Sequence, residues 1–267
     1  KESLKRLSIM PHRNNEMKIG QSLYFVGIKG VGMSALALIA HDLGYKVRGC
    51  DSQKEFITDQ ALNEANIVID DIDTIKNIPG DTDLVILGAA FSNDLPIVLD
   101  AKIKLISIVD YSQFLGQLTS RQELVAIAGT HGKTTTTALV SYILFASGYD
   151  PSFLIGTGHI AGLPANGRAG KGRYFICEAD DYRRSKVDPR PKFLDLNPAL
   201  AMITNIEHDH PDLYPTLADC IKAFHSFTTK IRPGGKLIVN GDDPNIKQLI
   251  KALGEERQDI EIISYGK

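Results

Sequence analysis

The sequence has few cysteines and almost no net charge. Its 267 residues include only Cys50, Cys177 and Cys220. These are far apart and odd in number, so they predict neither a disulfide framework nor a C-x-x-C metal site, and they fit a reducing compartment. The formal charge is −2, and no long block of like charge occurs. This balance gives no reason to expect a nucleic-acid partner.

Long apolar runs are also missing. No run reaches the roughly 18 residues that a membrane span requires, so no membrane insertion is expected. The first 18 residues are basic and polar and lack the apolar core of a signal peptide. We therefore predict a cytoplasmic protein. Because the chain starts at Lys1 rather than Met, residues 1–18 are expected to form a flexible extension.

What the sequence does contain is a repeated alternation of short apolar runs and longer helical segments. The first half predicts strands at 22–27, 45–50, 66–69, 83–88 and 104–109, with a helix at 31–43. The second half predicts strands at 123–128, 174–177, 200–205, 236–240 and 260–264, with helices at 133–147 and 216–230. Continuously apolar strands are typical of parallel sheets buried on both faces. The length and the βαβ order favour two doubly wound α/β domains, residues 19–120 and 121–267, joined near 119–122.

Glycines follow the first predicted strand, in 27-GIKGVGMSA-35. Bare backbone at Gly27, Gly30 and Gly32 lets a phosphate approach the N-terminus of the next helix, where free N–H groups favour an anion. Asp51 ends the second predicted strand, where a carboxylate can accept ribose hydroxyls. The pattern predicts a nucleotide site but does not distinguish NAD from a UDP-sugar. The alternative is a tight turn in which the glycines serve packing alone.

A second glycine loop, 126-AIAGTHGKTTTT-137, lies between a predicted buried strand and a helix. It differs from G-x-x-x-x-G-K-[ST] because its first glycine is Gly129. Lys133 would place a charge on the outer phosphates, Thr134 a hydroxyl on Mg²⁺, and Thr135 a hydrogen bond on a phosphate oxygen. The predicted nucleotide loop is Gly129, Thr130, His131, Gly132, Lys133, Thr134 and Thr135. The alternative is a capped helix start with an exposed lysine.

Acidic and histidine side chains follow two later strands, in 178-EADD-181 and 204-TNIEHDHPD-212. The carboxyl ends of parallel strands share one edge, so these groups are expected near the second glycine loop. Glu178 is nearest its strand end and is the best Mg²⁺ ligand, although a solvated acidic turn is the alternative. Of His208 and His210, two residues apart, only one is expected to face the site.

Taken together, AGTHGKTTTT, EADD, TNIEHDH and GIKGVGMSALA with Asp51 resemble the Mur ligase family over roughly residues 20–267. The resemblance implies a Rossmann-like UDP-sugar domain, a central Mg-ATP domain and a third domain. It implies an ATP-dependent ligase of peptidoglycan biosynthesis, joining UDP-N-acetylmuramate to L-alanine through an acyl phosphate. Lys133, Glu178 and His210 take its catalytic roles, with Thr134, Glu178 and His210 on magnesium. Gly27, Gly30, Gly32, Met33 and Asp51 take its sugar-nucleotide positions.

Some positions depart from the family pattern. The run is E-A-D-D-Y-R where E-A-D-E-[SY]-D is usual, Lys29 replaces a common glycine, and Pro211 follows His210 where leucine is usual. Extra residues around 186–192 lengthen the next loop. These positions bear on the choice of sugar and amino acid more than on ATP binding.

The 267 residues contain neither the family's H-N-x-x-N segment nor its C-terminal domain. We therefore expect an incomplete central domain, in a fragment of a longer ligase or a shortened nucleotide-binding module without turnover. A murein-peptide recycling ligase on the same UDP-sugar is a further alternative, because the amino-acid pocket is expected in the missing domain. A nicotinamide dehydrogenase explains residues 20–118 but leaves the loop at 129–135 without a role.

Overall fold

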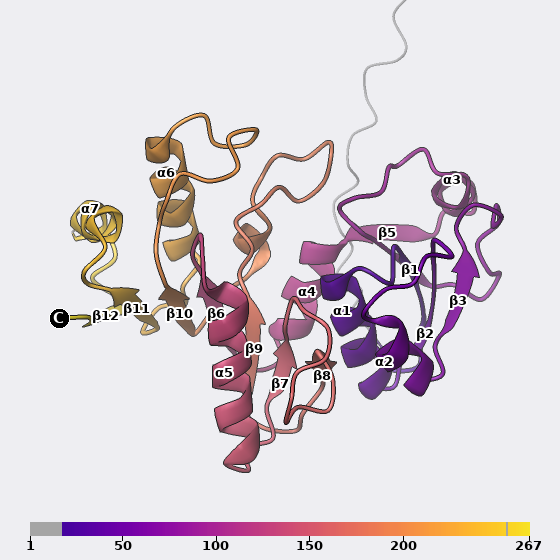
Figure 1. The fold of residues 1–267 in the computed structure, drawn as a ribbon. Coiled ribbons are helices and arrows are strands. Elements are labelled where there is room, and N and C mark those ends of the chain that lie inside the picture. Colours follow the sequence, from indigo (N-terminus) through magenta and orange to yellow (C-terminus); the bar gives the residue numbers. More distant parts are fainter. Residues whose placement is uncertain (1–17, 255) are drawn as a thin grey trace, which may run out of the picture.

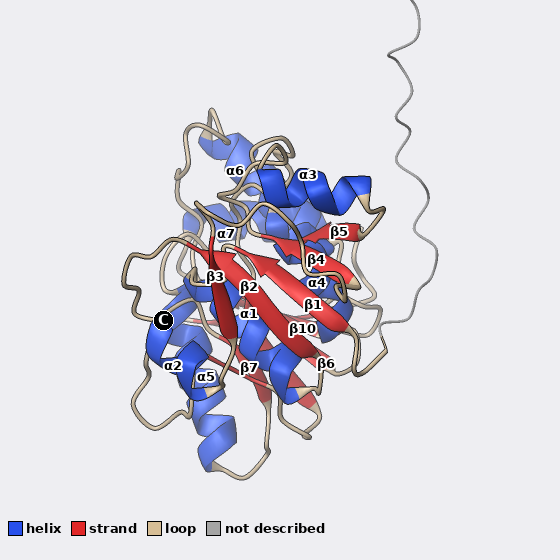
Figure 2. Ribbon diagram, turned by 90° about the vertical axis from the view of Figure 1, so that its right-hand side faces the viewer, coloured by secondary structure: helices blue, strands red, loops and turns tan. Residues whose placement is uncertain are grey.

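The computed structural model describes residues 18–254 and 256–267, so most of the predicted extension, residues 1–17, lies outside the described residues. The chain forms two sheets that lie side by side (Figure 1). The first has five parallel strands in the order β3-β2-β1-β4-β5, and Figure 2 shows them in that order. The second has seven strands in the order β12-β11-β10-β6-β9-β7-β8, all parallel except the β7–β8 pair. The predicted fold class, two α/β units with parallel sheets, is confirmed.

The first sheet is covered by helices on both faces, which explains its continuously apolar strands. Its strands are β1 Ser22–Val26, β2 Lys46–Asp51, β3 Val68–Asp71, β4 Leu84–Leu87 and β5 Ser107–Asp110. Its helices are α1 Val31–Asp42, α2 Asp59–Glu64, α3 Pro96–Ile103 and α4 Tyr111–Thr119. Phe25 packs with α1 and α4 on one face, whereas Tyr24 and Val26 pack with α3 on the other.

The second sheet follows the same principle. Its strands are β6 Glu123–Ala128, β7 Ser152–Leu154, β8 Gly167–Arg168, β9 Tyr174–Glu178, β10 Leu200–Ile203, β11 Lys236–Asn240 and β12 Glu261–Tyr265. Its helices are α5 Lys133–Ala146, the 3₁₀ turn η1 Lys192–Asp195, α6 Leu217–Thr228 and α7 Pro244–Leu253. Ile127 and Ile176 pack under α5, and Ala126 and Ala128 face the core that α6 and α7 complete. None of the helices in the described part of the chain has both the length and the apolar character needed to cross a bilayer.

All the predicted strands are present, but two begin more than one residue later than expected. β3 starts at Val68 rather than at 66, and β5 starts at Ser107 rather than at 104. The cause is a left-handed residue before each strand, Asn66 with φ 55° and Leu105 with φ 57°. Each ends a short helix that the apolar pattern did not predict. An apolar residue such as Leu105 can therefore belong to an exposed turn.

Helix α1 of the first unit packs directly against the β7–β8 hairpin of the second (Figure 1). Asn166, next to β8, donates from Nδ2 to the Val31 carbonyl at 3.0 Å and to Ser34 Oγ at 3.2 Å. Asn166 and Ser34 are both buried. A Cβ on Gly167 would collide with the Ala35 backbone, so only glycine permits this approach. The contact fixes how the start of α1 faces the second sheet.

We therefore expect Gly167→Ala to destabilise the fold by about 1–3 kcal/mol, because the added methyl forces α1 and β8 apart. Gly80→Ala is the matched control, because a Cβ at this exposed turn meets nothing within 4 Å. It should change stability by less than about 0.5 kcal/mol. Chemical denaturation of the two variants and the wild type measures the difference. Equal stability of the two variants would contradict the close packing of α1 on β8.

Candidate nucleotide site between the two sheets

The second glycine loop joins the end of β6 to the start of α5. Gly129 has φ 136° and Gly132 has φ 80°, both in the region that favours glycine. A side chain at Gly129 would also collide with Thr204. Gly132 is the N-cap of α5, and no side chain caps that helix. The loop therefore leaves the first N–H groups of α5 available to an anion.

The neighbouring strand end holds this loop in place. Thr130 N–H donates to the Asn205 carbonyl at 3.0 Å, and His131 N–H donates to Asn205 Oδ1 at 2.9 Å. Thr204 Oγ1 donates to the His131 carbonyl at 2.6 Å, and Glu207 N–H donates to Thr130 Oγ1 at 2.8 Å. Thr130 and His131 thus have their main-chain groups engaged by residues 204–207. Both stay predicted nucleotide-loop residues, and the structure shows what positions them.

Lys133 turns its ammonium inward. Its Nζ donates to the carbonyls of Gly129 at 2.5 Å and Thr130 at 3.2 Å, and pairs with Asp181 Oδ1 at 3.0 Å. The side chain of Lys133 is 17% exposed and that of Asp181 is 4% exposed. The alternative of an exposed, solvated lysine is therefore wrong. Three oxygen acceptors at one ammonium mimic the surroundings that phosphate oxygens supply.

Glu178 and Thr134 lie together at the ends of β9 and α5. Thr134 Oγ1 donates to Glu178 Oε2 at 3.1 Å, and Gly156 N–H donates to Glu178 Oε1 at 2.6 Å. Burial raises the pKa of Glu178, and the two hydrogen bonds offset only part of that effect. A half-buried carboxylate beside a hydroxyl is a set of hard oxygen donors that suits Mg²⁺. These two residues therefore fit the metal predicted for them.

His210 lies in a different arrangement. It has φ 52°, its Nε2 is 3.7 Å from Asp209 Oδ2, and its ring lies 4.6 Å from the Tyr182 ring. Within residues 18–254 and 256–267, no group of three or more His, Cys, Asp or Glu side chains is already assembled around a metal position. The structure thus joins Thr134 to Glu178 but does not join His210 to either. His208 Nε2 hydrogen-bonds the Tyr214 carbonyl at 2.8 Å.

The first glycine loop is held by the residue expected to bind ribose. Asp51 is only 5% exposed, and its carboxylate accepts from Lys29 N–H at 2.8 Å and Ser52 N–H at 2.7 Å. Gly27 has φ 84°, and a Cβ there would collide with Phe91. Asp51 therefore fixes the loop, whereas its predicted contact with ribose stays a prediction.

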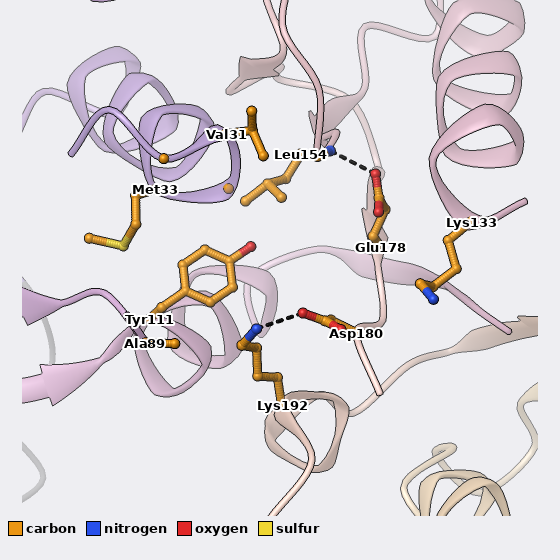
Figure 3. A pocket seen from close by; sticks show the side chains of 12 residues that line it. Val31, Met33, Ala89, Tyr111, Lys133, Leu154, Glu178, Asp180 and Lys192 are labelled. Atoms are coloured by element: carbon orange, nitrogen blue, oxygen red, sulfur yellow. Dashed lines mark hydrogen bonds and ion pairs between the residues drawn. The ribbon is translucent and has the colours of Figure 1, made fainter. Parts of the chain in front are cut away.

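The two glycine loops open onto one cavity of about 350 Å³ (Figure 3). The first unit contributes Gly30, Val31, Gly32, Met33, Ala89 and Tyr111, and the second contributes Lys133, Leu154, Gly156, Glu178, Asp180 and Lys192. Gly27 and Asp51 support the loop from outside this lining. The cavity brings the start of α1 to face the lysine and the glutamate of the second sheet.

Tyr111 and Lys192 are lining residues that sequence reasoning missed. Tyr111 directly follows β5, so its place at the carboxyl edge of the sheet was a usable signal. Lys192 ends the loop at 186–192, and its ammonium pairs with Asp180 Oδ2 at 2.6 Å. No spacing rule predicts that pair, because it depends on how the loop folds back onto β9.

Comparison with known families gives two matches that together cover most of the chain. The family described as "Mur ligase family, catalytic domain" matches residues 22–123. The family described as "Mur ligase middle domain" matches residues 127–267. The first match ends and the second begins within β6, Glu123–Ala128.

Individual proteins agree with these matches. A UDP-N-acetylmuramate–L-alanine ligase of Desulfitobacterium hafniense is 38% identical over 85% of this chain and 49% of its own length. The solved UDP-N-acetylmuramate-alanine ligase of Thermotoga maritima has a TM-score of 0.74 at 28% identity, over 85% of this chain and 51% of that one. A Neisseria UDP-N-acetylmuramate:L-alanyl-gamma-D-glutamyl-meso-diaminopimelate ligase has a TM-score of 0.80 at 24% identity. The match covers 93% of this chain and 78% of that one. The chain spans about half the length of the curated relatives it matches.

The raised pKa of Glu178 predicts how stability depends on pH. A carboxyl whose folded pKa is raised stabilises the fold at low pH, and this contribution is lost as pH rises through the folded pKa. Glu178→Gln removes the cost of the buried charge, so its melting temperature should exceed that of the wild type above pH 7. A difference of about 1 kcal/mol in the free energy of unfolding corresponds to a shift of about 2–4 °C in melting temperature for a chain of this size. The gap should shrink toward about pH 4, near the ordinary glutamate value.

Thermal denaturation of both proteins between pH 4 and pH 8, without divalent cations, checks this. Glu207→Gln is the control, because the Glu207 carboxylate is 63% exposed on the neighbouring loop. A gap between Glu178→Gln and the wild type that stays constant with pH would show that Glu178 carries no burial cost.

Proposed function

Because the chain belongs to the Mur ligase family, we propose that it carries the acceptor and ATP sites of a UDP-N-acetylmuramate–L-alanine ligase. The observation that carries the proposal is the single cavity onto which both glycine loops open. A ligase must bring a carboxylate and a triphosphate together, and each loop offers a helix N-terminus to one of these anions. Residues 19–120 would bind the UDP-sugar, and residues 121–267 would bind ATP.

On the ATP side, the phosphates would sit against the loop 129–135 and the N-terminus of α5. Phosphate oxygens would replace the carbonyls that now accept from Lys133 Nζ. Lys133 would then keep Asp181 as its buried counter-ion while it offsets charge on the outer phosphates. Thr135 would add a hydrogen bond to a phosphate oxygen.

On the sugar side, the diphosphate would sit at the N-terminus of α1. Gly30, Gly32 and Met33 line the cavity there, and their backbone can approach an anion closely. Gly27 and Asp51 lie outside the cavity lining and would act indirectly, by fixing the turn that holds these groups. This arrangement would direct the lactyl carboxylate of the sugar toward the second sheet.

The proposed reaction has two steps. A carboxylate oxygen attacks the γ-phosphorus of ATP, and the bond from that phosphorus to the β–γ bridging oxygen breaks, giving an acyl phosphate and ADP. The amine of L-alanine then attacks the acyl carbon. Phosphate leaves, the nitrogen loses a proton, and an amide remains. Both steps gather negative charge in one place, which Lys133 is placed to offset.

Magnesium fits the oxygen donors of Thr134 and Glu178, which would hold it beside the phosphate loop. Bound there, it would neutralise charge on the phosphates that the attacking carboxylate approaches. His210 is proposed as a second metal ligand by resemblance to the family pattern. Its ring now packs on Tyr182, so that role requires the side chain to turn from its present position.

A murein-peptide recycling ligase is the second candidate, because a solved ligase of that kind shares the fold. Both candidates use the same UDP-sugar, so they share the cavity described above. They differ in the amine that attacks. L-alanine is favoured because the curated relatives are named UDP-N-acetylmuramate–L-alanine ligases. A nucleotide-binding module without turnover would use the same two binding sites.

Lys133 gives the most direct test on the ATP side. Removing it alone would leave Asp181 buried without a cation, so Lys133→Ala is combined with Asp181→Asn. Loss of a charge-assisted contact to phosphate predicts binding of Mg-ATP about tenfold weaker or more. Isothermal titration calorimetry of the double variant, with Asp181→Asn alone as control, measures it. Equal affinity of the two variants for Mg-ATP would remove Lys133 from the phosphate site.

A further inference from the structure

Lys192 lines the cavity but belongs to neither glycine loop, so it has no role yet in nucleotide binding. It begins η1, its side chain is 15% exposed, and its Nζ pairs with Asp180 Oδ2 at 2.6 Å. Within the described chain, that carboxylate is the only hydrogen-bond acceptor of the ammonium. The Tyr182 ring lies 5.8 Å from the Lys192 Nζ. An ammonium has three N–H donors, so Lys192 retains donors for a ligand.

The position of Lys192 is fixed on both sides along the chain. Its own N–H donates to the Tyr182 carbonyl at 3.0 Å, and Phe193 N–H donates to the Asp180 carbonyl at 3.0 Å. Phe193 is fully buried against Phe224 and Phe227 of α6. These contacts tie η1 to the end of β9. Lys192 is therefore held at the cavity wall before any ligand arrives.

The loop that leads to Lys192 is also braced. Buried Arg184 pairs with Asp188, inside the loop, at 3.0 Å and also with Asp195, at the end of η1. Arg190 pairs with Asp188 at 2.7 Å. Such a network reduces the conformational freedom that a long loop would otherwise lose on binding. Segment 186–192 thus leads to a lysine through a loop held by ion pairs.

Tyr111 approaches the same cavity from the first unit (Figure 3). A Cβ on Gly32 would lie 3.1 Å from its hydroxyl, so the phenol sits beside the start of α1. No hydrogen bond to this hydroxyl exists among the described residues. Burial raises the pKa of Tyr111, and nearby Cys177, Asp180 and Glu178 raise it further. The phenol therefore stays protonated and keeps a donor directed into the cavity.

We propose that Lys192 and Tyr111 together bind the lactyl carboxylate of the acceptor. The inference rests on the proposed function, in which the start of α1 takes the diphosphate and the loop 129–135 takes ATP. A carboxylate has two oxygens, and the pair offers one donor from each unit. Lys192 is already paired with Asp180, and Glu178 lines the same cavity, so little positive charge is left over and a single negative charge is favoured over a phosphate dianion.

The test compares two ligands that differ in this carboxylate. UDP-N-acetylmuramate carries the lactyl group, and UDP-N-acetylglucosamine does not. Calorimetric titration of the 267-residue chain should show tighter binding of the first. Lys192→Met should weaken UDP-N-acetylmuramate binding by about tenfold and leave UDP-N-acetylglucosamine unchanged. Tyr111→Phe should act in the same direction with a smaller effect. Lys186 is an exposed lysine of the same loop, so Lys186→Met is the control and should leave the affinity for both ligands unchanged.

Each other outcome overturns the inference in a distinguishable way. An equal loss of affinity for both ligands in Lys192→Met would mean that the lysine supports the pocket or binds the diphosphate instead. Equal binding of both ligands by the wild type would mean that the carboxylate is not held here, while the UDP-sugar site of the proposed function stands. Binding of neither ligand by the wild type would contradict that proposed site as well. Melting temperatures of all variants establish that they remain folded.

Discussion

The buried contact between α1 and β8 is the constraint on which the rest of the site depends. Gly167 lets the two backbones touch, and Asn166 locks them by hydrogen bonds to Val31 and Ser34. These bonds are made in the first turn of α1, the same turn whose residues Val31, Gly32 and Met33 line the cavity. A second close approach, of Gly116 in α4 to the Asp195 backbone, places Tyr111 and η1 together. The spacing of the two glycine loops is thus set by packing, not by the loops themselves.

Charge balance explains how this cavity can exist without ligands. Two ammonium groups, of Lys133 and Lys192, face two acidic strand-end positions and are paired with Asp181 and Asp180. Burial alone would raise the pKa of Asp180, but Lys192 and the Tyr182 N–H hold it below its usual range. Glu178 has no such partner and keeps a raised pKa. The uncompensated group is therefore the one proposed for magnesium, and the paired lysines are those proposed for anions.

The sequence predicted the parts of this site that follow strand ends. Apolar runs and glycines located both loops, and the carboxyl-edge rule placed Glu178 near Thr134. It could not predict Lys192, because that side chain reaches the cavity only through a loop braced by Arg184. It also missed the short helices such as α3, whose eight residues give too little periodicity. Asp51 was predicted as a ligand contact, and its bonds to Lys29 and Ser52 depend on a turn that no pattern specifies.

The central claim is that one cavity serves a UDP-sugar on the first unit and Mg-ATP on the second. Thermal denaturation of the chain with UDP-N-acetylmuramate, Mg-ATP or NADH, each added alone, tests it most directly. A ligand at about 100 times its Kd adds about 2.7 kcal/mol of stability, which is visible as a higher melting temperature. We expect a shift with each of the first two ligands and none with NADH. A shift with NADH alone would contradict the claim and assign the first glycine loop to a nicotinamide cofactor.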